Sequence, residues 1–188
     1  MIEPTPGLVT LPEFEELLAT SDVKLECIAG EPLAFAGGSV AHGILCAKVI
    51  SMLTNATRAN CQTFTSDVAL LLPNSGSYVF PDASYTCERL DPSAIAIRAP
   101  MLVVEVISTD SVRRDRVEKL DAYQSLSSIQ EYLLIDSRRT WVAVYRRSGP
   151  TWTETTYHNP EDVVELVCVD IKPTLGELYA GTERIRTA

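Results

Sequence analysis

The chain has 188 residues, of which 46% are hydrophobic and 22% charged, and its formal net charge at pH 7 is −9. This length fits one domain, and the composition is that of a globular protein, which excludes a disordered chain. Proteins that hold nucleic acid by releasing counterions normally show a basic surface, so the acidic balance disfavours tight non-specific DNA binding. Any basic strip must be local, and the places to look are Arg113, Arg114 and Arg116, then Arg138 and Arg139, then Arg146 and Arg147.

Two classes of segment are not expected. No apolar run approaches the roughly 20 residues needed to cross a bilayer, and the N-terminal MIEPTPGLVT lacks the basic and apolar regions of a secretory signal. The five cysteines are dispersed without a CxxC spacing, which argues against a disulfide framework and against structural zinc. We therefore expect reduced core cysteines in a cytoplasmic protein with no membrane association.

The first half of the chain predicts helices and strands in alternation. Residues 11–19 have helical periodicity, and residues 24–28 and 31–36 form a hairpin with a turn at Ala29-Gly30. A long helix is predicted over 39–56, with Ser39 as its N-cap. Residues 61–72 and 77–87 each predict a strand, and Pro81 in the second suits an edge, a strand start or a bend that re-aims Asp82.

The second half predicts the centre of a sheet. After a loop at 88–99, MLVVEVIS (101–108) has the near-continuous apolar pattern of a central strand covered on both faces. An amphipathic helix is predicted over 109–126, a hairpin over 131–136 and 140–147, further strands over 151–157 and 163–168, and a short helix over 173–181. The order predicts an α/β (mixed α+β) fold, with a central mixed sheet flanked by helices.

Two acidic residues interrupt apolar strands, Asp82 in FPDAS and Glu105 in MLVVEVIS. A buried carboxylate is costly unless something pairs with it. Lys119 falls inside the apolar arc of the predicted helix, which is marked by Val112, Val117, Leu120, Tyr123 and Leu126. A lysine that faces a sheet either extends out to solvent or meets an acid, and Glu105 is its natural partner.

These residue types suit phosphodiester cleavage. The reaction requires neutralisation of charge on the phosphate and a deprotonated water, and a hard cation such as Mg²⁺, or Mn²⁺ in its place, supplies both from one or two carboxylates. A nearby lysine can hold the attacking water or stabilise the developing charge. Asp82 and Glu105 are the candidate metal ligands, and Lys119 is the candidate amine.

Several motifs together resemble the putative restriction endonuclease family of the PD-(D/E)XK nuclease superfamily. They are PDAS (81–84), PMLVVEVIS (100–108), the spacing Asp115-Lys119-Tyr123, EYLLID (131–136), VAVYR (142–146) and, early in the chain, LECIAGE (25–31). The resemblance covers residues 10–180 and implies one restriction-endonuclease-like domain. It implies Asp82 and Glu105 as metal ligands, Lys119 and Glu26 as further catalytic residues, DNA as substrate and a homodimer with two active sites.

The chain departs from the family pattern at two places. Ile107 stands where the superfamily has its lysine, so Lys119 on the next helix takes that role. Leu25 and Ala29 replace a tyrosine and an aspartate of the early motif, although Glu26 matches its first acid.

Other interpretations of the same residues stay open. Asp82 could be a turn residue, Lys119 only an ion-pair partner of Glu105, and Glu26 an exposed strand residue. Tyr123 is more typical of a core residue than of a catalytic one, and His42 more typical of a satisfied histidine than of a base. Two other functions compete: a catalytically inactive nucleic-acid- or protein-binding module that keeps the nuclease fold, and an enzyme acting on a smaller phosphate ester.

Overall fold

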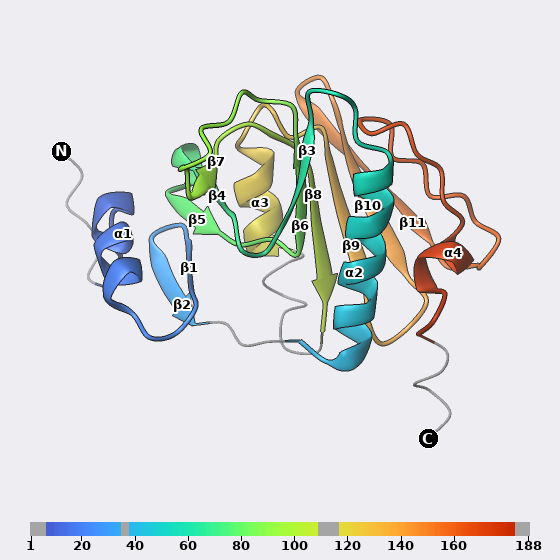
Figure 1. Cartoon of the computed structure of the whole chain (residues 1–188), viewed down its shortest axis with the longest axis horizontal. Coiled ribbons are helices and arrows are strands. Elements are labelled where there is room, and N and C mark those ends of the chain that lie inside the picture. Colours follow the sequence, from blue (N-terminus) through green and yellow to red (C-terminus); the bar gives the residue numbers. More distant parts are fainter. Residues whose placement is uncertain (1–6, 35–37, 109–116, 183–188) are drawn as a thin grey trace.

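The computed structural model describes residues 7–34, 38–108 and 117–182, which form two β-sheets with helices between and beside them (Figure 1). The smaller sheet has the strand order β2-β1-β5-β4-β7. Its strands are β1 (Leu25–Ile28), β2 (Glu31–Ala34), β4 (Ala69–Leu72), β5 (Ser77–Val79) and β7 (Ala96–Ile97). The predicted β1–β2 hairpin is confirmed, and Ala29 and Gly30 turn the chain with φ of 50° and 85°.

The larger sheet has the order β11-β10-β9-β8-β6-β3. The sheet is mixed, because β8 runs parallel to β9 while the other strand pairs of the sheet are antiparallel. Its strands are β3 (Gln62–Thr65), β6 (Ala83–Thr86), β8 (Pro100–Ile107), β9 (Glu131–Asp136), β10 (Val142–Ser148) and β11 (Thr151–Tyr157). The predicted fold class, with β8 as a buried central strand, is confirmed.

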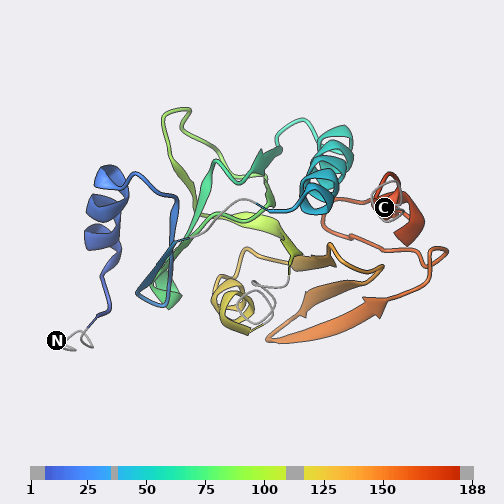
Figure 2. The ribbon, with the colours of Figure 1, turned by 90° about the horizontal axis from the view of Figure 1, so that it is seen from below.

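Helices cover both faces of the larger sheet (Figure 2). On one face, α2 (Val40–Asn55) packs Leu45, Val49 and Leu53 into the same cluster as Val104 and Val106 of β8. On the other face, α3 (Lys119–Gln124) lies between the two sheets. Its Ala122 and Tyr123 share a core cluster with residues of both sheets, among them Val103, Ile107, Leu70 and Val79. Successive side chains of β8 therefore point to opposite faces of the sheet, one set toward α2 and the other toward α3, as the two-residue period of a strand requires.

The remaining helices lie at the ends of the chain. The first, α1 (Leu11–Thr20), begins at a capping box formed by Thr10 and Glu13 and buries Phe14 against the smaller sheet. A short 3₁₀ turn, η1 (Pro73–Ser75), joins β4 to β5, and α4 (Leu175–Tyr179) closes the described chain beside α2. None of the described helices is long and apolar enough to cross a membrane.

Two predicted strands are wrong as single strands, because each is divided between the two sheets. Residues 61–72 form β3 in the larger sheet and β4 in the smaller one, with a turn after Thr65 whose carbonyl accepts a hydrogen bond from Val68 N at 3.2 Å. Residues 77–87 divide into β5 and β6 at Phe80-Pro81-Asp82. Proline has no N–H to donate to a neighbouring strand, so the strand is interrupted at this residue. Of the three positions predicted for Pro81, the structure shows the bend that changes the direction of Asp82.

Other predictions need smaller corrections. Residues 163–168 are not a strand; Val163 and Leu166 make only isolated bridges to Thr174 and Ile171. In the predicted helix over 109–126, residues 109–116 lie outside the described residues, among them Asp115 and Val112. Val117 is 54% exposed and does not belong to the buried face, whereas Lys119 and Tyr123 do.

The prediction that all five cysteines are reduced is wrong for two of them. Cys61 and Cys87 form a disulfide, while Cys27, Cys46 and Cys168 are free. The partners stand just beyond the pair Gln62↔Thr86, so the antiparallel register of β3 and β6 brings them opposite each other. A sequence separation of 26 residues conceals this adjacency.

Candidate functional site

The candidate site lies at the carboxyl end of β8, where the flanking strand β6 begins. β6 pairs with β8 through Ala83↔Val104, and continuing that register places Asp82 opposite Glu105. Asp82 precedes the first residue of β6, and its Oδ2 accepts a hydrogen bond from Val106 N at 2.7 Å. The carboxylate thus takes the place of a strand partner at the edge of β8.

Lys119 bridges the two sheets. Its Nζ lies 2.9 Å from Glu26 Oε1 on β1 of the smaller sheet and 2.9 Å from Glu105 Oε1 on β8 of the larger one. All three side chains are buried, with at most 5% of each exposed. Three charged groups are tolerated in such a place only when each is paired and hydrogen-bonded, so α3 and both sheets are held in one arrangement here.

Two further donors fix the carboxylates. The hydroxyl of Tyr123, one turn after Lys119 on α3, donates to Glu105 Oε1 at 2.6 Å, and Phe80 N donates to Glu26 Oε1 at 3.3 Å. Burial, reinforced by the charge of Glu105, raises the pKa of Tyr123 well above its usual value. The hydroxyl therefore stays protonated over the physiological range and remains a donor to Glu105.

On the opposite face of the larger sheet, α2 brings two more polar side chains to Asp82. His42 Nε2 lies 3.2 Å from Asp82 Oδ1, and Cys46 Sγ lies 3.4 Å from His42 Nδ1. Burial and the neighbouring charge of Asp82 raise the pKa of the Cys46 thiol, so it is protonated at neutral pH. His42, Cys46 and Asp82 offer one nitrogen, one sulfur and one oxygen, all within 4.8 Å of one another.

The structure brings all four sequence-predicted residues to this end of β8. The pairing of Lys119 with Glu105 is confirmed as a contact, and Glu26, for which an exposed position was an open alternative, is 2% exposed and shares the same lysine. The contribution of α2 was not predicted. The only signal for it was the spacing of His42 and Cys46, four residues apart on a predicted helix, which places both on one face.

The basic strips singled out in the sequence serve other purposes where they are described. Arg138 and Arg139 pair with Asp136, and Arg146 pairs with Glu131. Arg147 donates to backbone carbonyls of residues 124, 126 and 129 and stacks on Trp152, 4.5 Å from the ring centre. The strip at 113–116 lies outside the described residues.

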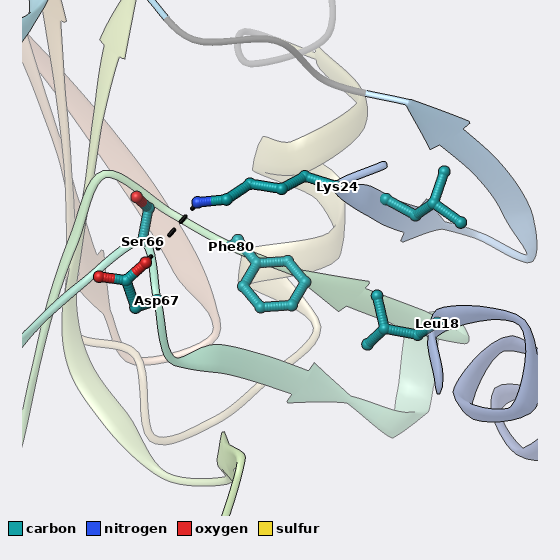
Figure 3. A pocket seen from close by; sticks show the side chains of 6 residues that line it. Leu18, Lys24, Ser66, Asp67 and Phe80 are labelled. Carbon is teal, nitrogen blue, oxygen red and sulfur yellow. Dashed lines mark ion pairs between the residues drawn. The ribbon is translucent and has the colours of Figure 1, made fainter. Parts of the chain in front are cut away.

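A pocket of about 120 Å³ lies elsewhere, between α1, the start of β1 and the turn after β3 (Figure 3). Leu18, Leu25 and Phe80 give it apolar walls, and Lys24 and Asp67, 3.6 Å apart, cross its mouth as an exposed ion pair. The lining contains a single carboxylate, Asp67, which is already paired with a lysine. The carboxylate cluster at β8 is therefore the candidate site.

Comparison with known proteins gives concordant results. Residues 11–172 match the model of the Uma2 family, which is described as "Putative restriction endonuclease". Two proteins of Synechocystis sp., the uncharacterized proteins sll1609 and slr1290, are similar. The first is 31% identical over 153 residues (79% of this chain, 86% of that protein), and the second 29% identical over 161 residues (84% of each).

A solved structure shares the fold. The crystal structure of a putative nuclease belonging to DUF820 from Anabaena variabilis matches with a TM-score of 0.77 and 18% sequence identity, over 93% of this chain and 99% of that chain. Membership of the putative restriction endonuclease family indicates a nuclease-type hydrolase that acts on nucleic acid. Restriction-endonuclease-like folds generally use divalent metal ions. From the match over residues 11–172 it follows that this chain belongs to the putative restriction endonuclease family, Uma2.

Proposed function

We propose that the protein is a metal-dependent endonuclease that hydrolyses phosphodiester bonds in DNA, and that residues 10–180 form a single restriction-endonuclease-like domain. One observation carries the proposal: the ammonium group of Lys119 is buried between Glu26 and Glu105, at the end of β8 where Asp82 is also fixed. Among the described residues of the site, three carboxylates outnumber one lysine. An excess of carboxylates over cationic side chains at a largely buried site favours a bound cation.

The residues fit a divalent metal. Asp82 and Glu105 present carboxylate oxygens from adjacent positions of two paired strands, and oxygen is the ligand that Mg²⁺ and Mn²⁺ prefer. When bound, such a cation would neutralise charge on the phosphate and lower the pKa of a water. We propose Asp82 and Glu105 as its ligands.

The other residues of the site then have distinct roles. Lys119 would orient the attacking water and stabilise the charge that develops on the phosphate, because its Nζ already lies 2.9 Å from the proposed ligand Glu105. Glu26, at the same distance from Nζ, holds the ammonium in place. Tyr123 donates to Glu105 and so fixes the rotamer of that carboxylate.

We also propose that the protein acts as a homodimer, since cutting both strands of a duplex takes two active sites. Light scattering of the purified protein on a sizing column would check this. A mass of about 41 kDa, twice the 20.6 kDa of one chain, is expected, and 20.6 kDa would contradict it.

A second candidate function is a catalytically inactive module that retains the nuclease fold and binds nucleic acid or protein. It is favoured by the complete pairing of Lys119 with two carboxylates, which also suits a structural ion pair, and by the net charge of −9. An enzyme that hydrolyses a smaller phosphate ester is a third candidate, since the same residues would serve it.

The test is cleavage of supercoiled plasmid and of single-stranded DNA with Mg²⁺ or Mn²⁺. Wild-type protein, Asp82→Ala and Glu105→Ala are purified in parallel, with the exposed Glu165→Ala as a control for contaminating nucleases. We expect the first two substitutions to lower the rate by a factor on the order of a hundred or more, and Glu165→Ala to leave it unchanged. Equal activity in all preparations, or none in any, would overturn the proposal. Turnover of bis(p-nitrophenyl) phosphate alone would favour the third candidate.

A further inference from the structure

The face of Asp82 that looks toward α2 is lined by a mixed set of metal-binding atoms. His42 and Cys46 stand four residues apart in the first two turns of α2, so both side chains lie on the face that meets Asp82. His42 Nε2 is 3.2 Å from Asp82 Oδ1, and Cys46 Sγ is 3.9 Å from the same ring nitrogen and 3.4 Å from the other. None of the three side chains is needed to explain the pairing of Lys119 with Glu26 and Glu105.

Asp82 and His42 are held in place by their surroundings. The other oxygen of Asp82 accepts from Val106 N at 2.7 Å, which fixes the carboxylate to β8. The backbone amide of His42 donates to the N-cap residue Ser39, whose Oγ lies at 3.2 Å. Gly38 passes directly over the imidazole ring, and a Cβ at that position would overlap it. The ring thus occupies space that only glycine at position 38 leaves open.

The spacing of the three donors suits a small tetrahedral site. Bonds of about 2.0 Å to nitrogen or oxygen and about 2.3 Å to sulfur imply ligand atoms about 3.3–3.6 Å apart. The three donor atoms already lie within 4.8 Å of one another, so small rotamer changes would close them around an ion. Three protein ligands also leave the fourth position open, as catalytic zinc sites do.

We infer that His42, Cys46 and Asp82 form a binding site for a transition-metal dication of the Zn²⁺ or Co²⁺ class. Thiolate and imidazole select such ions over Mg²⁺, which takes oxygen ligands almost exclusively. On binding, the Cys46 thiol loses its proton to solvent as the sulfur–metal bond forms. The inference deepens the proposed nuclease, on which its biological use rests: the site shares Asp82 with the proposed Asp82–Glu105 centre, so a thiophilic metal would be placed beside the phosphate.

The test is a titration of the metal-free full-length protein with CoCl₂, followed by absorption spectroscopy without any substrate. We expect one equivalent of Co²⁺ to give thiolate-to-cobalt charge-transfer absorption in the near ultraviolet and the intense visible bands of four-coordinate Co²⁺. ZnCl₂ should displace the signal and excess MgCl₂ should not. Cys46→Ser should abolish the charge-transfer band, and His42→Gln should weaken Co²⁺ binding about tenfold or more.

The matched control is Cys168→Ser, because Cys168 is also a half-buried free cysteine beside a carboxylate, Glu131. It should keep the full band, and circular dichroism would verify that every variant is folded. No band with wild-type protein, a band that survives Cys46→Ser, or displacement by Mg²⁺ would overturn the inference; in the last two cases the His42–Asp82 contact is only structural. Co²⁺ binding through Cys46 without any DNA cleavage would keep this site and overturn the nuclease, while cleavage with Mg²⁺ and no cobalt band would do the reverse.

Discussion

Lys119 contacts carboxylates from two different sheets, so at the scale of single residues it is both a structural group and a candidate for the chemistry. Removing the ammonium leaves Glu26 and Glu105 buried without it, and breaking a buried charge cluster from one side is costly. A catalytic role adds a second effect, the loss of cleavage. The two effects can be separated by removing part of the leftover negative charge.

We therefore expect Lys119→Met to lower the free energy of unfolding by about 3–5 kcal/mol and to abolish cleavage. The double variant Lys119→Met/Glu26→Gln should regain a large part of the stability and none of the activity. Urea unfolding followed by circular dichroism, with the plasmid assay alongside, measures both quantities. Lys172→Met, which breaks an exposed ion pair with Glu165, should cost at most about 1 kcal/mol. Cleavage by the double variant would show that Lys119 is only a structural partner.

At the scale of elements, the β9–β10 hairpin is fixed by Asp136 at the end of β9. Its side chain is 1% exposed, and it accepts hydrogen bonds from the guanidinium groups of Arg138 and Arg139 at 3.1 Å. Burial raises the pKa of Asp136, but the hydrogen bonds and charge of Arg138, joined by Arg139, outweigh it, so the pKa lies below its usual value. A carboxyl whose pKa is lowered by folding stabilises the protein above its unfolded-state pKa, and that contribution is lost as the pH falls through the folded-state pKa.

Asp136→Asn should therefore lower the free energy of unfolding at pH 7 by about 2 kcal/mol, the scale of hydrogen bonds to a charged group. The difference from wild type should begin to shrink as the pH falls below about 4, where the carboxyl of the unfolded chain takes up a proton, and should disappear only below the lower pKa of the folded state. Chemical unfolding at pH 7, 5 and 3 measures it, with Glu161→Gln as a control that removes the same charge from an exposed position. A difference that stays constant with pH would show that the Asp136 carboxylate is not stabilised by its arginine partners.

The disulfide Cys61–Cys87 joins the edge strand β3 to β6, the strand that begins beside Asp82. A reducing cytoplasm, the location expected from the sequence, would disfavour this bond. Its partners are nevertheless placed by the register of two strands, so the pair is brought together whether or not it is oxidised.

Thiol titration of protein denatured without reductant should find three reactive cysteines, and five after reduction. Closure of the 26-residue separation contributes about 3.5 kcal/mol in the chain-entropy estimate. The reduced protein and Cys61→Ser/Cys87→Ser should both unfold at correspondingly lower denaturant concentration. Five reactive thiols before reduction would show that the pair is reduced in the purified protein.

At the scale of the whole molecule, the net charge determines how strongly the binding of a nucleic-acid substrate depends on salt. The net charge is −9, and the arginines described at 138, 139, 146 and 147 are bound by acids or by backbone carbonyls. These four arginines are therefore less available to neutralise phosphates. A protein of this kind releases few counterions when it binds DNA.

Binding of DNA by the Glu105→Ala variant should accordingly depend weakly on salt. Two to four neutralised phosphates correspond to a slope of log K against log[salt] of about −2 to −4, which fluorescence anisotropy of a labelled duplex would measure. A slope steeper than about −6 would contradict this expectation. Such a slope would mean that basic residues other than the arginines at 138, 139, 146 and 147 contact phosphates. Arg113, Arg114 and Arg116 would be the first of these to substitute.

Local patterns in the sequence determined much of this protein. The apolar run around Glu105 specified a central strand, Ser39 specified the start of α2, and the position of Lys119 among apolar residues specified that it meets an acid. These are consequences of side-chain periodicity and of the cost of burying a charge, which act over a few residues. The family motifs likewise follow from residues at fixed short spacings.

Tertiary structure alone decided what is shared between distant segments. The breaks at 66–68 and 80–82 send each predicted strand into two sheets, because pairing partners far along the chain determine where a strand can continue. Glu26 meets Lys119 across 93 residues and His42 meets Asp82 across the face of the larger sheet, and no local pattern encodes either contact. The sequence alone predicts which residues belong to the site. Their assembly into one cluster depends on how the two sheets pack around α3.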